Sequence, residues 1–170
     1  MDIFIIKTDN AKKVSDELLQ QYQKKKISNS NTLKTHCLSY LMIDKILKEV
    51  YQIEDREIVF ENKKPNLKTK EKFFSISHSN DMIALAFSDS NCGIDIEKIK
   101  LREFSKISKR MGFNAETLGE FYQEWTQYEA IYKLGEDSVC SSYANYELED
   151  YSMTAVSTNP LEDFEVYMQC

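Results

Sequence analysis

Glycine and proline are scarce in this chain of 170 residues, which contains four glycines and two prolines. Such low contents exclude collagen-like and low-complexity architectures. The glycines form neither a GxGxxG nor a GxxxxGK pattern, so a glycine-rich phosphate-binding loop is excluded as well. Because 42% of the residues are hydrophobic and 12% are aromatic, the chain is predicted to fold around an ordinary hydrophobic core.

Cysteine and histidine are also sparse, and long apolar runs are missing. The four cysteines form no CxxC pair and the two histidines are far apart, so no structural zinc site is expected. The longest apolar run, Met82 to Phe87, has six residues, and charged residues interrupt the N-terminal segment. We therefore expect no membrane span and no signal peptide, and scattered cysteines favour a reducing, cytoplasmic location.

Charge is unevenly distributed along the chain. Residues 1–110 contain 21 Lys/Arg and 16 Asp/Glu, a net charge of +5, whereas residues 111–170 contain one basic residue and 12 acids, a net charge of −11. The acidic final third argues against nucleic-acid binding. Within the first part, residues 98–110 are strongly basic. This stretch is either a solvated helix face or a docking surface for an acidic partner.

Hydrophobic periodicity predicts an α+β fold. The helices are expected at residues 14–26, 33–51, 103–111 and 114–134. The strands are expected at residues 3–6, 57–61, 73–79, 82–88, 92–98, 142–149, 153–158 and 164–168. The charged segment 63–72 is expected to be a loop, and the three consecutive strands within 73–98 are expected to form an antiparallel meander.

Two short segments contain side chains suited to binding a cation and a phosphate. Asp95 and Glu97 lie two residues apart in a predicted strand, so both carboxylates point to one face, and Gly93 permits a bulge or a close backbone approach. Glu129 and Lys133 share a helix face, which by itself indicates a surface ion pair. Together, three carboxylates and one lysine supply hard oxygen ligands for Mg²⁺ and a cation for a phosphate.

A third segment, Ser75 to Ser79, combines small hydroxyls with His78 and is suited to cradling a phosphate. The alternative is that His78 is an ordinary core or surface histidine. A nucleophilic pair of Ser77 and His78 is disfavoured, because adjacent residues of a strand point to opposite faces.

Four segments, in order, resemble a known family: KKP (63–65), FSISHS (74–79), GIDIE (93–97) and WTQYEAIYK (125–133). They are similar to the larger, two-halved type of 4′-phosphopantetheinyl transferase, which activates peptide synthetases and acyl carrier proteins. The resemblance extends over about residues 60–135. It implies two similar α/β halves, residues 1–90 and 91–170, related by a pseudo-twofold axis. Each half would have an antiparallel sheet and a long helix, and coenzyme A would bind at the seam between them.

The resemblance also implies an activity and a metal site. Such an enzyme is a holo-acyl-carrier-protein synthase of fatty-acid, polyketide or nonribosomal peptide biosynthesis. It transfers the 4′-phosphopantetheine arm of coenzyme A to a serine of an apo acyl or peptidyl carrier protein and releases 3′,5′-ADP. Asp95, Glu97 and Glu129 would hold Mg²⁺, or Mn²⁺, and Lys133 would neutralise a pyrophosphate oxygen. These four residues are therefore the expected metal-binding and catalytic centre.

Further residue roles follow from the same resemblance. Ser77 and His78 would contact the phosphates of coenzyme A, and Lys64 would lie beside the nucleotide. Glu116 would help to deprotonate the carrier serine. The basic stretch 98–110 would dock the acidic carrier, and two halves in one chain imply a site completed within a monomer. The run Lys24–Lys26, together with Lys34, is a candidate for contacts with the 3′-phosphate, or only a helix end.

The chain departs from the family pattern at three positions. It has Lys63 where glycine is frequent, Ser75 where asparagine is frequent, and Tyr128 where a lysine usually precedes the helix glutamate. The loss of that lysine affects the catalytic rate and the choice of carrier more than metal binding. The alternative hypothesis is a non-catalytic module of the same fold that binds coenzyme A or a carrier protein.

Overall fold

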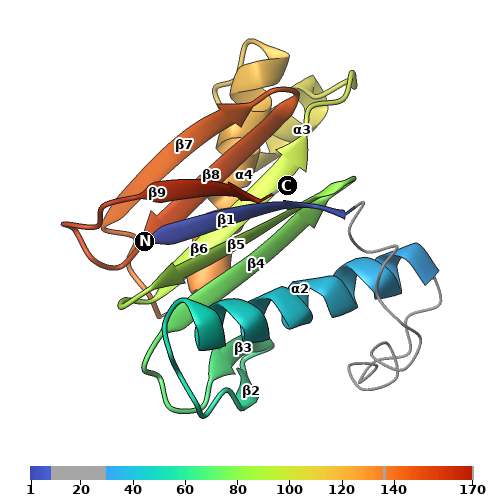
Figure 1. Ribbon diagram of the computed structural model, residues 1–170. Coiled ribbons are helices and arrows are strands. Elements are labelled where there is room, and N and C mark those ends of the chain that lie inside the picture. The colour runs from blue at the N-terminus through green and yellow to red at the C-terminus, as the bar shows by residue number, and fades with distance from the viewer. Residues whose placement is uncertain (9–29, 136, 170) are drawn as a thin grey trace.

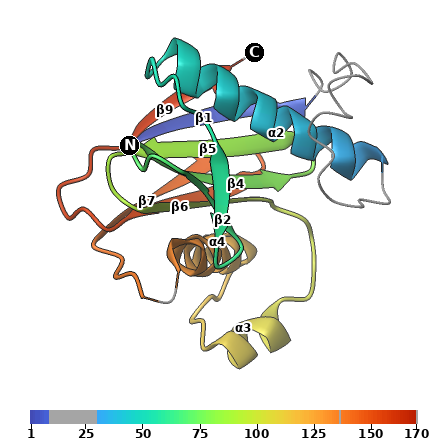
Figure 2. The same ribbon diagram turned by 90° about the horizontal axis from the view of Figure 1, so that it is seen from below.

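The protein is described by a computed structural model that covers residues 1–8, 30–135 and 137–169. Two β-sheets pack face to face between two long helices, α2 (Ser30–Glu49) and α4 (Leu118–Leu134), as Figure 1 and Figure 2 show. The α+β class is therefore confirmed. The similarity of the two halves and their boundary near residue 90 stay predictions, and the expected helix 14–26 lies outside the described residues.

The first sheet has four strands and separates two hydrophobic clusters. In spatial order its strands are β4 (Phe73–Ser79), β5 (Met82–Ser88), β1 (Asp2–Lys7) and β9 (Glu165–Gln169). One face packs on α2, where Leu85 and Phe87 meet Leu38 and Leu47. Because side chains alternate along a strand, the neighbouring residues of β1 and β5 point to the opposite face and pack on the second sheet.

The second sheet carries the predicted carboxylates. Its strands, in spatial order, are β6 (Cys92–Lys98), β8 (Tyr151–Ser157) and β7 (Ser142–Leu148), all antiparallel. Ile94 and Ile96 are fully buried between the two sheets. The alternate residues, Gly93, Asp95 and Glu97, lie on the other face of the strand, which α4 covers.

The predicted three-stranded meander is wrong for its third strand. β4 and β5 pair as expected, but β6 leaves this sheet and pairs with β8. The physical reason is that β1 occupies the second edge of β5, so β5 has no free edge to offer β6. The chain therefore changes sheets between β5 and β6, close to residue 90, where the two halves are expected to meet.

The charged segment 63–72 was expected to be a loop, and this prediction is wrong for its first part. Strand β3 (Lys64–Leu67) pairs with β2 (Ile58–Glu61) in an antiparallel hairpin. Asn62 and Lys63 form the connection with φ angles of 49° and 68°, the left-handed conformations of a tight hairpin turn. Pro65 is tolerated because the sheet has only two strands, each of them an edge.

Two helices follow the second sheet's first strand. Helix α3 (Ser105–Met111) ends at Gly112, whose φ of 73° is the left-handed conformation that favours glycine at this position. Helix α4 begins four residues later than expected, after a capping box in which Thr117 and Glu120 bond each other's backbone N–H groups. Among the described residues, no helix combines the length and the apolar character needed to cross a membrane.

Candidate active site

A partly buried ion pair joins the two sequence segments that were predicted to carry the chemistry. The ammonium of Lys133 on α4 donates to Asp95 Oδ1 at 2.7 Å and to the carbonyl of Ile94 at 2.9 Å. Asp95 on β6 is only 5% exposed. Among the ion pairs of the described residues, Lys133 pairs with Asp95 and not with Glu129. The simple surface pair along the helix is therefore not formed.

Close packing of α4 on β6 sets the geometry of this pair. A Cβ atom added at Gly93 would lie 2.1 Å from the backbone oxygen of Ala130 and 3.0 Å from Val156 Cγ2. Of the two sequence alternatives for Gly93, the structure thus shows the close approach, which only a residue without a side chain allows. Because Ala130 precedes Lys133 by about one helical turn, this contact holds Lys133 above Asp95.

A second contact anchors the preceding turn of α4 to the same sheet. The hydroxyl of Thr126, which is fully buried, lies 2.8 Å from the Thr154 hydroxyl and 3.3 Å from the Ser152 hydroxyl, both on β8. These buried hydroxyls satisfy one another, which avoids the cost of unpaired buried polar groups. The helix is thus attached to both β6 and β8, and its register along the sheet is fixed.

The remaining oxygen of Asp95 suits a cation. Ser77 donates to Oδ1 at 2.8 Å, as Lys133 does, whereas the buried Oδ2 has no hydrogen-bond partner among the described residues. Leaving a buried carboxylate oxygen unpaired is costly unless a ligand satisfies it. A hard cation such as Mg²⁺ accepts this type of oxygen ligand. The residues present therefore fit a divalent cation at this oxygen.

Glu97 lies two residues further along β6, on the same face as Asp95. It accepts a hydrogen bond from Ser79 at 2.8 Å. Its pKa is raised, chiefly by loss of solvation and also by repulsion from the Asp95 carboxylate, and these effects outweigh the opposing bond from Ser79. Two partly desolvated carboxylates side by side concentrate negative charge, which a bound cation would relieve.

The third predicted metal ligand, Glu129, is half-buried on α4, one turn before Lys133. In the part of the chain that the structure describes, no three His, Cys, Asp or Glu side chains are grouped as metal ligands. The structure thus brings together Asp95, Lys133 and Ser77 by direct contact. The assignment of Glu129 as a ligand stays a prediction.

His78 lies at the rim of this centre. Its side chain is exposed. Its pKa is lowered, chiefly because part of the ring loses solvation against the protein and also because of the positive charge of Lys133. The neutral form is thereby favoured, although the nearby Asp95 opposes the shift. Ser77 next to it points to the opposite side of the strand, where its hydroxyl is buried against Asp95.

Lys64 lies between the hairpin of β2 and β3 and the second sheet. Its ammonium donates to Asn91 Oδ1 and, at 2.9 Å, to the carbonyl of Cys92, and burial lowers its pKa. Asn91 in turn donates to the carbonyl of Leu134 at 2.9 Å and to the Ser138 hydroxyl at 2.8 Å. Through Asn91, Lys64 therefore ties β3 to the C-terminal end of α4, and its ammonium is held by the Asn91 amide oxygen and the Cys92 carbonyl.

Glu116 is not brought to the ion pair. It is exposed and lies just before the start of α4, and its backbone N–H donates to the Glu120 carboxylate at 2.8 Å. The 17 residues of α4 are about 25 Å long, so Glu116 and Lys133 lie near opposite ends of the helix. Lys34 lies on α2, and the run Lys24–Lys26 lies outside the described residues.

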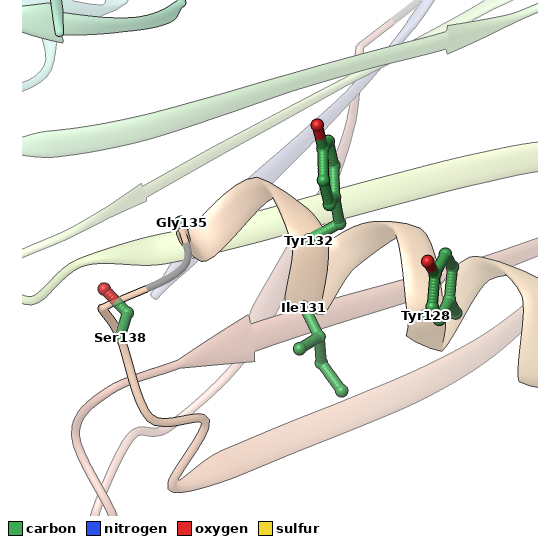
Figure 3. A pocket seen from close by; sticks show the side chains of 5 residues that line it. All are labelled: Tyr128, Ile131, Tyr132, Gly135 and Ser138. Atoms are coloured by element: carbon green, nitrogen blue, oxygen red, sulfur yellow. The ribbon is translucent and has the colours of Figure 1, made fainter. Parts of the chain in front are cut away.

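A shallow hollow lies beside the C-terminal half of α4, and Figure 3 shows the side chains around it. It is lined by Tyr128, Ile131, Tyr132, Gly135 and Ser138. None of these side chains is charged, so the hollow is not suited to holding a phosphate. The carboxylates and Lys133 remain the chemically active part of the helix.

Two roles were not predicted from the sequence: that of Ser79, which holds Glu97, and that of Asn91, which links Lys64 of β3 to Leu134 of α4. The signal for the first was present in the sequence. Ser75, Ser77 and Ser79 are spaced by two residues and therefore share one face of β4. No local signal marked Asn91, because its partners are far away in the chain.

The four motifs can be set beside a known protein that is similar in sequence. No protein-family model matches the chain. The chain is 32% identical over 113 residues to the 4′-phosphopantetheinyl transferase psf-1 of Bacillus pumilus, an alignment that covers 57% of this chain and 48% of that protein. The aligned region therefore spans about half the length of this curated relative. The match confirms that the chain resembles the 4′-phosphopantetheinyl transferase superfamily, as its four motifs indicate.

Proposed function

We propose that this protein transfers the 4′-phosphopantetheine arm of coenzyme A to a serine hydroxyl of an apo carrier protein. The observation that carries the proposal is the buried Asp95 carboxylate, with Lys133 on one oxygen and no partner on the other. This arrangement suits a site that receives a cation together with a charged phosphate ligand. The similarity to a named phosphopantetheinyl transferase supports the same reaction.

In this proposal the carboxylates of Asp95, Glu97 and Glu129 hold Mg²⁺ or Mn²⁺. The ion, when bound, neutralises charge on the pyrophosphate and makes its phosphorus easier to attack. Lys133 shares its ammonium between Asp95 and a pyrophosphate oxygen and thereby stabilises the charge that develops during transfer. Its position depends on the Gly93 contact, where the helix backbone approaches the strand closely.

The reaction is a phosphoryl-type transfer. The oxygen of the carrier serine forms a bond to the β-phosphorus, and the bond from that phosphorus to the bridging pyrophosphate oxygen breaks. 3′,5′-ADP leaves, and the serine proton passes to solvent or to a base. Glu116, the candidate from the family resemblance, lies near the opposite end of α4 from Lys133 and is not assigned to this step. Catalysis of this kind depends on positioning and charge neutralisation rather than on a covalent enzyme intermediate. The ion pair and its supporting strand supply both.

Three residues around the seam are proposed to recognise the nucleotide part of coenzyme A. His78 is exposed at the rim of the ion pair and can donate a hydrogen bond to a phosphate oxygen. Ser77 precedes it on β4 and points to the other side of the strand, where its hydroxyl already orients Asp95. Lys64 lies at the edge of the hairpin, beside the start of β6, where a nucleotide crossing the seam would meet it.

The proposed carrier-binding surface is the basic stretch 98–110, which includes helix α3. Lys100, Arg102, Lys106, Lys109 and Arg110 are exposed. Lys98 is instead paired with Asp150 at 2.9 Å and therefore contributes less charge to the surface. A row of exposed basic side chains directly after β6 suits an acidic carrier whose serine must reach the site.

A second candidate is a module that binds coenzyme A without turnover. The observation that favours it is that no three acidic side chains of the described residues are grouped as metal ligands. The two candidates differ in a simple way. Both predict that coenzyme A raises the melting temperature of the protein, whereas only the transferase modifies a carrier.

The proposal is tested with Asp95→Asn and Glu129→Gln, which keep the shape of each side chain and remove its charge. A fluorescent coenzyme A conjugate and an apo acyl carrier protein are incubated with each variant and Mg²⁺, and labelled carrier is measured on a gel. We expect transfer by the unmodified protein and a loss of at least about a hundredfold in each variant. Wild-type transfer by both variants would contradict the metal assignment, and thermal unfolding of each variant controls for folding.

A further inference from the structure

One edge of strand β6 is paired by side chains instead of by another strand. β8 occupies the first edge of β6 in a regular antiparallel ladder. At the second edge, three alternate N–H groups donate to serine hydroxyls of β4 at 3.1, 3.3 and 3.1 Å. The pairs are Ile94 with Ser75, Ile96 with Ser77, and Lys98 with Ser79. This serine ladder satisfies backbone donors that would otherwise stay open at an edge.

Each serine hydroxyl accepts one N–H and has one proton of its own to donate. Ser77 donates this proton to Asp95 Oδ1, and Ser79 donates to Glu97 Oε2, both at 2.8 Å. Ser75 comes level with Gly93, which has no side chain to accept a proton. The serine ladder therefore has one purely structural member and two members that also hold a carboxylate.

The two carboxylates depend on their serines to different degrees. Asp95 is held by Lys133 as well as by Ser77 and is almost fully buried. Glu97 has a longer side chain and is only half-buried, and Ser79 fixes one of its two oxygens. A glutamate side chain loses substantial rotational entropy when it is ordered. A hydrogen bond that orders it beforehand reduces the cost of binding a ligand.

We infer that Ser79 is a positioning residue for the cation: it holds Oε2 of Glu97 so that the other carboxylate oxygen is presented next to Asp95. This inference rests on the proposed function, since the cation is the one assigned there. Partners of metal ligands in other proteins affect metal affinity by about 10- to 100-fold. Ser79 contacts neither the nucleotide nor the carrier in this scheme, so its loss should act on the metal alone.

The test uses Ser79→Ala with Ser75→Ala as its matched control. Both variants remove a hydroxyl that accepts an N–H of β6, but only the first removes a bond to a carboxylate. Mn²⁺ alone is titrated into the full chain, and bound ion is measured by electron paramagnetic resonance. We expect Ser79→Ala to weaken Mn²⁺ binding about tenfold. Ser75→Ala should bind Mn²⁺ within twofold of the unmodified protein.

A kinetic measurement separates positioning from a general loss of structure. We expect Ser79→Ala to need about tenfold more Mg²⁺ for half-maximal transfer, with kcat at saturating Mg²⁺ within about twofold of the unmodified protein. Ser79→Thr, which keeps the hydroxyl, should restore Mn²⁺ affinity. Equal Mn²⁺ affinity in Ser79→Ala and the unmodified protein would overturn the inference alone. Absence of Mn²⁺ binding by the unmodified protein would overturn the proposed metal site and the inference with it.

Discussion

The contact between Gly93 and Ala130 allows a prediction whose size can be worked out from the structure. In Gly93→Ala the new methyl group would lie 2.1 Å from the backbone oxygen of Ala130, where ordinary contacts begin near 3.4 Å. The obstacle is helix backbone, which cannot rotate away as a side chain can. Either α4 or β6 must therefore move by about 1 Å, which is a large displacement in a close-packed interior.

The expected cost of this substitution is about 3 kcal/mol in the free energy of unfolding, the upper end for overpacked interiors. For a chain of this size that corresponds to a decrease in melting temperature of about 6–12 °C. A displaced α4 would also move Lys133 away from Asp95, so transfer activity should decrease in the fraction that remains folded. Urea unfolding followed by circular dichroism gives the first quantity, and the carrier-labelling assay gives the second.

Gly119→Ala is the matched control for this prediction. Gly119 lies in the same helix, and a Cβ added there meets nothing within 4 Å. Alanine within a helix is favoured over glycine by about 0.5–1 kcal/mol, so this variant should be as stable as the unmodified protein or slightly more stable. If Gly93→Ala unfolded at the same urea concentration as Gly119→Ala, the packing argument would be refuted.

Two further predictions concern charge. Lys133→Met should lower the free energy of unfolding by about 2–3 kcal/mol, because the substitution leaves the buried carboxylate of Asp95 without its counter-ion. Urea denaturation measures this free energy, and an unchanged urea midpoint would contradict the prediction. The double substitution Lys106→Glu and Lys109→Glu should raise KM for an acidic carrier about tenfold at low salt and leave coenzyme A affinity unchanged. An unchanged carrier KM, determined from initial rates, would exclude α3 as the docking surface.

Local sequence patterns were sufficient to predict most of the helices and strands. Alternating apolar residues marked β4 and β6, a continuous apolar run marked β5, and helical spacing marked α2 and α4. The start of α4 was placed too early because the capping box at Thr117 and Glu120 was not used. Strand β3 was missed because Lys64 and Pro65, in a segment rich in lysine, are typical of a loop. Pro65 is tolerated there because both strands of the hairpin are edges.

The pairing of strands could not be read from local pattern. Three neighbouring strands separated by short turns favour a meander, but the choice of partner depends on which edges are free. β1, at the start of the chain, takes the edge of β5 that β6 would need. The strand with which β6 pairs instead, β8, begins more than fifty residues after β6 ends. Such long-range competition leaves no mark in a short window of sequence.

For the candidate site as well, local sequence patterns indicated the residues but not the partners they contact. The spacing of Asp95 and Glu97 and the helical position of Lys133 pointed to residues that the structure places within one small region. The partner of Lys133 was not predictable, because Glu129 is its neighbour on the helix and Asp95 approaches it only through the contact of α4 with β6. The serine ladder was visible as a spacing of two, but its function depends on the change of sheet after β5.

The central claim is tested most directly by the mass of a carrier protein. An apo acyl carrier protein is incubated with this protein, coenzyme A and Mg²⁺, with a parallel sample containing EDTA, and its intact mass is measured. We predict a mass gain of one 4′-phosphopantetheine arm that is lost with EDTA. No mass gain across several apo carriers, while coenzyme A still raises the melting temperature of the protein, would contradict the transferase and indicate the binding module.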